Sequence, residues 1–322
     1  MGLKLNQLDG SVTWASSWDF VGLIDGATAT RCTGSKVIFT GGAQASATSW
    51  RGVSVAYAVN DGQLLGEYVT NGGDVSVDVI NDVQVSPSGD ILVAGSVQEI
   101  GGQMQQVIIK LSPYMEELWS IQSGPENGDG DFEANGIGVT ELGEVVVCGT
   151  HSTPDSSNVV LSKYTSAGSL IWQEQTPLME HNSQSAVDLT IDTETNSAIV
   201  LTNDVLNGNS DVGILKYSND GGLVWRKSYN GAMNGEDVAH DICSDSEGGF
   251  ILAIQSNGIN GIEYIVQRYT AHSVMLPADD GTEQGFSFFE ENIGQVLAVG
   301  ENPSSVDNRS RNSSPMIYTQ DQ

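Results

Sequence analysis

The chain of 322 residues has few basic residues, three cysteines, eight prolines and no long apolar run. Twelve lysines and arginines stand against 41 acidic residues, giving a net charge of −29. Such a charge repels nucleic acid and anionic lipid, attracts cations and basic partners, and also favours solubility in saline water. The negative charge therefore argues against nucleic-acid binding. Because no run of 18 apolar residues occurs, the sequence does not predict membrane insertion.

The sequence also lacks the common signatures of catalysis and of disulfide or zinc frameworks. Cys32, Cys148 and Cys243 lie in separate apolar stretches, which predicts buried free thiols. No GxSxG, HExxH or P-loop pattern occurs, and the four histidines are far apart. We therefore predict no catalytic residue, although enzymatic activity stays open.

A repeat of about 53 residues runs through the chain. Residues 163–172 return as 216–225, so Trp172 and Trp225 are 53 residues apart, and Trp119 precedes Trp172 by the same interval. Leu65 takes the tryptophan place one repeat earlier, and Trp14 opens the series. A second landmark, an apolar strand that ends in glycine, recurs at 37–41, 91–95, 145–149 and 296–300. Two landmarks in step indicate a repeat architecture.

Each repeat has the pattern of four short strands separated by turn residues. In the fifth copy we expect strands at 223–228, 239–244, 250–255 and 262–269. Six such units predict an all-β fold, a six-bladed β-propeller with four-stranded antiparallel blades, as one domain over residues 1–322.

The two ends of the chain are expected to share one blade. Residues 315–319 align with a third strand and residues 10–14 with a fourth, so one blade would combine C-terminal and N-terminal strands and protect both edges. Residues 3–5 are surplus to that count.

The repeated pattern Lys-Tyr-[Ser/Thr]-x-x-Gly-x-Leu-x-Trp is followed by a loop rich in Gly and Asp and then by segments 236–242 and 247–253. It resembles the repeats of secreted and cell-surface microbial β-propeller proteins. The resemblance implies the propeller fold and an extracellular or cell-surface location. It also implies a scaffold that binds protein or carbohydrate at the cell surface, and it implies no reaction. Residues 1–6 contain no apolar core of a signal peptide.

Two columns of polar residues appear when the repeats are aligned at 53 residues. The first consists of Asp25, Asp78, Asp131, Gln184 and Asp237, with Glu283 at the matching place of the last copy. The second consists of Ala29, Asp82, Asn135, Asp188 and Asp241. Residues four apart on a strand share a face. Because both columns begin the innermost strand, they predict polar rings around one end of the central channel.

Two interpretations of the first column stay open. Carboxylates that face one cavity repel each other unless cations compensate them, and Ca²⁺ binds six to eight oxygen ligands. Alternatively, each aspartate caps a turn by accepting backbone N–H groups of its own blade. We expect capping for most of the column. The exception is the acidic loop 126–133, for which a Ca²⁺ site and an ordinary solvated loop are equally supported.

The candidate metal ligands are therefore Asp25, Asp78, Asp129, Asp131, Glu133 and Asp237, with Ca²⁺ as the possible cofactor. Asn308 and Asn312 lie in N-x-Ser/Thr sequons and are candidate glycosylation sites.

Three functions compete at this point. The leading hypothesis is a non-enzymatic extracellular binding or structural scaffold, with Ca²⁺ as the candidate stabilising ion. The first alternative is a carbohydrate- or lactone-directed hydrolase or lyase with a metal at the channel mouth. The second alternative is a subunit of a surface filament or sheath.

Overall fold

The computed structural model describes residues 2–5, 9–72, 76–98, 101–125, 129–176, 183–231, 233–245, 248–258, 261–269 and 297–298. Within these ranges all regular structure is β-strand, and none of them contains a helix able to cross a membrane. Glu283, Asn308, Asn312 and the predicted strand 315–319 lie outside the described residues.

The strands form five units of four antiparallel strands, here called blades 1 to 5, and one N-terminal hairpin. The hairpin consists of β1 (Gly2–Leu5) and β2 (Val12–Ser16). Blade 1 is β3 (Asp25–Cys32), β4 (Lys36–Ser46), β5 (Ser49–Ala58) and β6 (Leu64–Val69); blade 2 is β7 (Val77–Val85), β8 (Ile91–Gln98), β9 (Gln105–Leu111) and β10 (Glu117–Ser123). Blade 3 is β11 (Asp131–Val139), β12 (Val145–Ser152), β13 (Ser157–Tyr164) and β14 (Leu170–Gln175). Blade 4 is β15 (Ser183–Asp192), β16 (Ser197–Leu206), β17 (Asn209–Tyr217) and β18 (Leu223–Tyr229); blade 5 is β19 (Asp237–Ser244), β20 (Phe250–Gly258), β21 (Gly261–Tyr269) and β22 (Leu297–Ala298).

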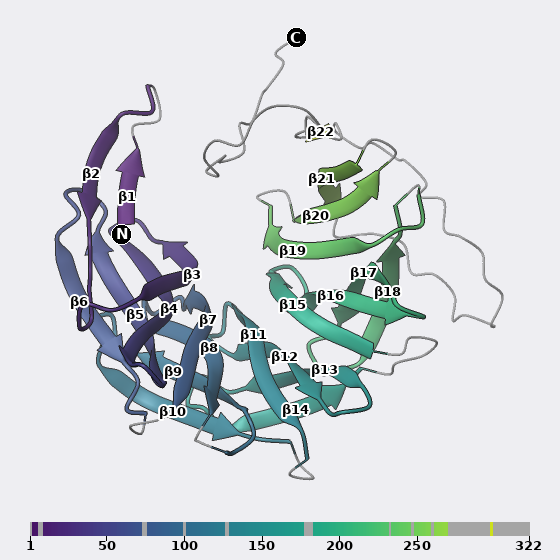
Figure 1. The fold of residues 1–322 in the computed structure, drawn as a ribbon, viewed down its shortest axis with the longest axis horizontal. Helices are drawn as coiled ribbons and strands as arrows, with labels where there is room; N and C mark the ends of the chain where they lie inside the picture. The colour runs from purple at the N-terminus through teal and green to yellow at the C-terminus, as the bar shows by residue number, and fades with distance from the viewer. Residues whose placement is uncertain are drawn as a thin grey trace.

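The blades follow one another around a common centre, with the first strand of each blade innermost and the fourth strand outermost (Figure 1). A single parallel bridge between Trp50 and Val77 joins the sheets of blades 1 and 2. The predicted strands of the fifth copy agree with β18, β19, β20 and β21 to within three residues. The all-β class and the radial arrangement of four-stranded units are therefore as expected.

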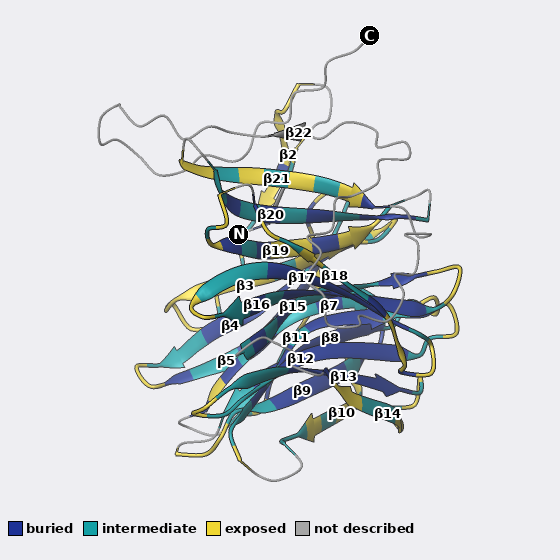
Figure 2. Ribbon diagram, turned by 90° about the vertical axis from the view of Figure 1, so that its right-hand side faces the viewer, coloured by how far each residue is buried: buried dark blue, intermediate teal, exposed yellow. Residues whose placement is uncertain are grey.

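The core lies between successive blades, because the second and third strands carry apolar residues on both faces. Ile199 and Leu201 of blade 4, for example, pack with Phe250 and Leu252 of blade 5. The central strands are mostly buried, whereas β21 is largely exposed (Figure 2). Burial on both faces explains why these strands are continuous apolar runs rather than alternating ones.

Two assignments at the fourth strands need correction. Trp119, Trp172 and Trp225 occupy one register position, opposite Lys110, Lys163 and Lys216. In blade 1, however, that position is held by Gly66, opposite Ala56, so the assignment of Leu65 to the tryptophan place is wrong by one residue. Similarly, residues 296–300 have the pattern of a second strand, but Leu297 and Ala298 pair with β21 at the place of a fourth strand.

The N-terminal hairpin also differs from expectation. Residues 3–5 are not surplus, because β1 pairs with β2 in antiparallel register. The thiol prediction holds only for Cys148, which is buried, since Cys32 and Cys243 are exposed. Those two residues lie on β3 and β19, the inner strands at the two ends of the described arc.

Candidate functional site

The inner strands of all five blades carry a β-bulge at the same place. The register shifts after Ala27, Ile80, Ala134, Ala186 and Ala239. A bulge changes the direction of the following side chains and strengthens the local twist. The bulge lies between the first polar column and the second. Residues four apart share a face only on an unbroken strand, so the two columns do not share one face here.

The register places one member of the first column elsewhere. Asp25, Asp78, Gln184 and Asp237 each lie two residues before their bulge. In blade 3 the corresponding residue is Phe132, and Asp131 lies one position earlier. The inclusion of Asp131 in this column is therefore wrong, because blade 3 has one extra residue before its inner strand. Phe132 is buried, like Asp78, Gln184 and Asp237.

The carboxylates of the first column accept hydrogen bonds from the preceding blade or from the segment that follows it. The Thr70 hydroxyl donates to Asp78 Oδ2 at 2.6 Å, and the Gly231 N–H donates to Asp237 Oδ2 at 2.6 Å. The exposed Asp25 accepts a longer bond, 3.4 Å, from the Phe20 N–H. Capping within each aspartate's own blade is therefore not what the structure shows, because these bonds tie the start of one blade to the end of the previous one.

The acidic loop of blade 3 is described from residue 129 onward. Asp131 Oδ1 accepts the Met104 N–H of blade 2 at 2.8 Å, and the Asp129 carbonyl lies 2.7 Å from His151 Nε2. Burial, followed by the charge of Asp131, raises the pKa of Glu133. No group of three or more potential metal-binding side chains of His, Cys, Asp or Glu occurs among the described residues. Whether Asp129, Asp131 and Glu133 bind Ca²⁺ stays a prediction.

The second column brings carboxylates of three blades into one electrostatic group. Burial raises the pKa of Asp82 to about 6, even though the N–H groups of Ile137 and Val83 and the charge of Arg31 favour its ionised form. Burial and the charge of Asp82 raise the pKa of Asp188 further, and Asp241 contributes through charge and a hydrogen bond. Asp82, Asp188 and Asp241 belong to blades 2, 4 and 5, so like charges from three inner strands repel each other.

Bulge residues brace neighbouring inner strands. The Thr28 hydroxyl donates to the Ile80 carbonyl at 2.5 Å, and the Asn81 amide donates to the Ala134 carbonyl at 2.8 Å. Asn135 was assigned to the second column, but the register places Gly136 there and makes Asn135 the bulge residue. Its side-chain oxygen accepts the Thr150 hydroxyl at 2.9 Å.

The lysine and tryptophan of the repeat form a second contact between blades, which we call the clamp. Lys110 and Trp119 of blade 2 both donate to the Ser166 carbonyl of blade 3, at 3.2 Å each. Lys163 and Trp172 of blade 3 likewise donate to the Asn219 carbonyl of blade 4, at 3.4 and 3.0 Å.

A left-handed glycine completes the clamp. Gly168 and Gly221 have φ of +86° and +89°, and a Cβ placed on them would lie 3.2 and 3.0 Å from the rings of Trp119 and Trp172. The glycine therefore lets the indole lie against the turn of the next blade.

The repeated cation also forms an ion pair inside its own blade. The pairs join a third-strand Lys or Arg to an acidic residue at the end of the first strand or in the turn that follows it: Lys110–Asp90 at 3.0 Å, Lys163–Glu144 at 2.6 Å, Lys216–Asp192 at 2.8 Å and Arg268–Asp245 at 2.6 Å. The Lys-Tyr motif thus builds the blade, and its charges are not free to act on a ligand.

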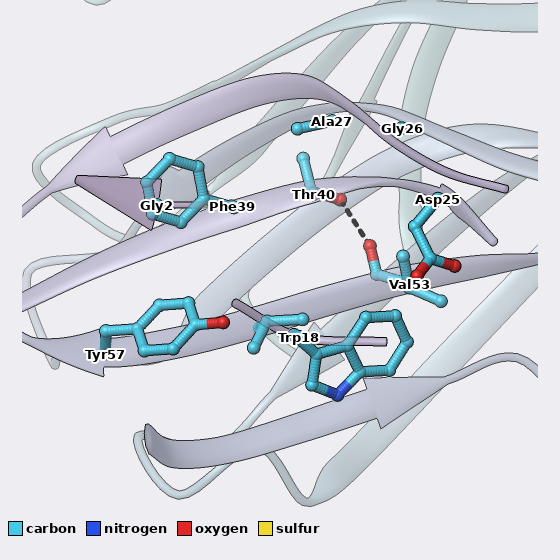
Figure 3. Close-up of a pocket in the computed structure, with 10 residues that line it drawn as sticks. Gly2, Trp18, Asp25, Gly26, Ala27, Phe39, Thr40, Val53 and Tyr57 are labelled. Atoms are coloured by element: carbon cyan, nitrogen blue, oxygen red, sulfur yellow. Dashed lines mark hydrogen bonds between the residues drawn. The ribbon is translucent and has the colours of Figure 1, made fainter. Parts of the chain in front are cut away.

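A cavity of about 70 Å³ lies on the face of blade 1 that points away from blade 2. Trp18, Phe39 and Tyr57 supply aromatic rings around it, and the Asp25 carboxylate lies at its edge (Figure 3). Small-molecule sites usually measure roughly 300–1,000 Å³, and one water molecule has a share of about 30 Å³ of liquid volume. The cavity therefore has room for one side chain or a few water molecules rather than for a sugar chain.

Asp82, Asp188 and Asp241 are not among the metal ligands that the sequence predicts, although they stand in register in the second column. The signal that could have identified them is their spacing, because each follows the buried residue of the first column by four positions. The bulge that precedes each of them leaves no recognisable mark in a single sequence.

Comparison with known proteins gives similarity of fold only. No protein-family model and no curated protein matches the sequence. Among solved structures, the chain is similar to a protein of unknown function from Dyadobacter fermentans, with 11% identity, a TM-score of 0.49, and 77% of this chain and 81% of that chain covered. It is also similar to a quinohemoprotein alcohol dehydrogenase from Pseudomonas putida (9% identity, TM-score 0.44, 75% and 50% covered) and to dipeptidyl peptidase 4 from Porphyromonas gingivalis (10%, 0.44, 85% and 43%). The chain spans about half the length of these two enzymes.

Proposed function

We propose that the chain is a non-enzymatic scaffold that works outside the cell or on its surface, as a single six-bladed propeller domain. The observation that carries the proposal is the clamp. The lysines and tryptophans that define the repeat donate to the next blade, and the aspartates of the first column accept from the previous one. Residues repeated in this way build the ring and leave the loops between strands for binding.

The charge of the chain indicates the chemistry of the partner. A net charge of −29 favours a basic protein surface or a polysaccharide bound through cations. We propose that Ca²⁺ stabilises the ring, because carboxylate oxygens are the ligands that Ca²⁺ prefers and because Asp82, Asp188 and Asp241 repel each other. Asp129, Asp131 and Glu133 are the ligands proposed for the acidic loop.

The test compares binding with turnover. Purified protein is assayed on immobilised cell-surface polysaccharides and on a basic model protein, and separately with chromogenic glycosides, esters and lactones, each with Ca²⁺ or chelator. The scaffold proposal predicts binding without turnover, and a higher melting temperature in Ca²⁺. Turnover by the parent protein that is lost in the Asp188→Asn variant would overturn the proposal.

One observation favours the hydrolase alternative enough to define its test. Asp82, Asp188 and Asp241 come from three blades, and the pKa of Asp82 is raised to about 6 chiefly by burial, which is a feature of many acid–base sites. Should turnover be found, Asp188→Asn must abolish it. An exposed control, Asp220→Asn, must leave it unchanged.

A further inference from the structure

The hairpin β1–β2 has the contacts of the two outer strands of a blade. Lys4 and Trp14 are register partners, as Lys110 and Trp119 are in blade 2. Both donate to one carbonyl of blade 1, that of Val59, at 3.1 and 2.8 Å. This is the clamp of blades 2 and 3, with β1 as the third strand and β2 as the fourth.

The glycine of the clamp is present as well. Gly62 of blade 1 has φ of +73°, and a Cβ placed on it would lie 2.6 Å from the indole of Trp14. The Ser16 hydroxyl donates to the Gly62 carbonyl at 2.6 Å. The prediction that one N-terminal strand joins three C-terminal strands therefore does not fit the contacts of β1.

The inner half of the same blade-1 face is uncovered. In β3 seven of eight residues are exposed, whereas the corresponding strands β7, β11 and β15 have buried residues at alternate positions. The cavity lined by Phe39 and Tyr57 lies on this face. In the part of the chain that the structure describes, β1 pairs only with β2, so its other edge has room for a strand.

The far end of the arc shows the matching surface. Val266 of β21 is 41% exposed, whereas its register equivalents Ile108, Leu161 and Ile214 are fully buried against the next blade. Tyr264 is 52% exposed, and its equivalent Val212 in blade 4 is fully buried. Both ends therefore display faces that are buried at every junction between blades 2 and 5.

We propose that β1 and β2 are the outer half of a composite blade, and that the part of the same chain after Ala298, residues 299–322, docks as its inner two strands. This inference rests on the proposed six-bladed ring. The occupant is the chain itself, because the residues after Tyr269 are one repeat in length and Leu297–Ala298 already pair with β21 at the edge of the opening. The inner strands of blade 2, with their turn, need only residues 77–98.

The side chains that dock must be apolar toward blade 1. The wall of Phe39, Val53, Val55 and Tyr57 is apolar, and a cavity of about 70 Å³ fits a single aliphatic or aromatic side chain. The backbone of the docked strand satisfies the free edge of β1, which otherwise is a template for pairing with another chain.

Thiol labelling of the full chain tests the proposal. In a background in which the exposed Cys32 and Cys243 are changed to Ser, cysteine is introduced as Ala27→Cys, beside the cavity, or as Tyr264→Cys, on β21. The control is Leu142→Cys on a turn of blade 3, where the side chain is 76% exposed. Rates of reaction with a maleimide are measured natively and in denaturant by mass spectrometry.

The proposal predicts native labelling at least tenfold slower than the control at both positions, in a protein that is monomeric by light scattering. Equal rates at the three positions would overturn the docking. Slow labelling only in a dimer or filament would assign the surface to a second copy, and would also overturn it. Neither outcome touches the binding and turnover assays, so failure of the docking and failure of the scaffold function are distinguishable.

Discussion

The tryptophans of the repeat differ in burial although they share one register position. Trp225 is 6% exposed and stacks on Phe250 of blade 5, with ring centroids 6.4 Å apart, whereas Trp172 is only partly buried. Trp225→Ala should therefore reduce the free energy of unfolding by about 3–5 kcal/mol, and Trp172→Ala by less. Urea unfolding of both variants measures this, with Leu142→Ala as the exposed control. Equal losses for the two tryptophans would contradict the packing described.

Asp211 is expected to make stability depend on pH. Burial, then the charges of Asp237 and Asp204, raise its pKa to about 6, above the usual value of 3.8. At the equivalent place in blade 1 the residue is Arg51, beside Asp78, so that junction pairs opposite charges where the junction of blades 4 and 5 carries like charges. A raised pKa means that the folded state keeps the proton more strongly than the unfolded state does.

The stabilisation from protonated Asp211 should be fully present below about pH 4 and lost as the pH rises through about 6, with little further change above about pH 7. Asp211→Asn should remove this part of the pH dependence, whereas Asp220→Asn on an exposed turn should retain it. Urea unfolding between pH 4 and pH 8 gives the comparison. A parallel dependence in the parent protein and in Asp211→Asn would show that Asp211 is not the titrating group.

The register position of a residue was predictable where the pattern repeats without interruption. Where a single residue is inserted, the predicted position was wrong. The tryptophan register of blades 2 to 4 followed directly from the 53-residue interval. Asp131 was misplaced because an extra residue before β11 moves Phe132 into the buried position. One aspartate looks like another in sequence, so only the pairing of β11 with β12 reveals the shift.

At the scale of strands and turns, the junction of blades 1 and 2 differs from the other clamps. Where the next blade has glycine in the turn, the fourth strand presents tryptophan. At the junction of blades 1 and 2 the roles are exchanged, because Gly66 faces Met115, which has φ of +68°. Lys36 of β4 then donates to the Pro113 carbonyl in place of a third-strand lysine. The junction keeps its packing contact and its hydrogen bond with different residues.

The turn glycine of the clamp gives a matched pair of variants. Gly221→Ala adds a Cβ in a left-handed conformation and within 3.0 Å of Trp172, whereas Gly10→Ala adds one at φ of +69° with no atom within 4 Å. The conformational cost, roughly 1–2 kcal/mol, is common to both. Gly221→Ala should therefore destabilise the protein measurably more than Gly10→Ala in urea unfolding. Equal effects would mean that the indole does not depend on the glycine.

The four strands expected in the fifth copy were predictable because each is a short stretch of strand-forming residues bounded by turn residues. The bulges were not, since residues as different as Thr28, Asn81 and Val187 hold the extra position. The pairing of β1 with β2 was missed for another reason. Four residues are too few for a periodic signal, and only the shared acceptor of Lys4 and Trp14 identifies their role.

For the whole molecule, the proposed docking would make the N-terminal hairpin an integral part of a closed ring rather than an appendage. An isolated two-stranded hairpin is marginally stable in water. Its persistence must therefore come from the clamp on blade 1 and from the strands proposed to cover the free edge of β1.

Hydrogen exchange of the full chain, followed by mass spectrometry, measures this directly by comparing peptides that cover residues 2–16 with peptides that cover β9 and β10. In a closed ring the amides of β1 and β2 are protected to a similar degree as those of β9 and β10, and both sets exchange together when the ring opens. Rapid exchange throughout residues 2–16, with β9 and β10 still protected, would contradict the closed six-bladed ring.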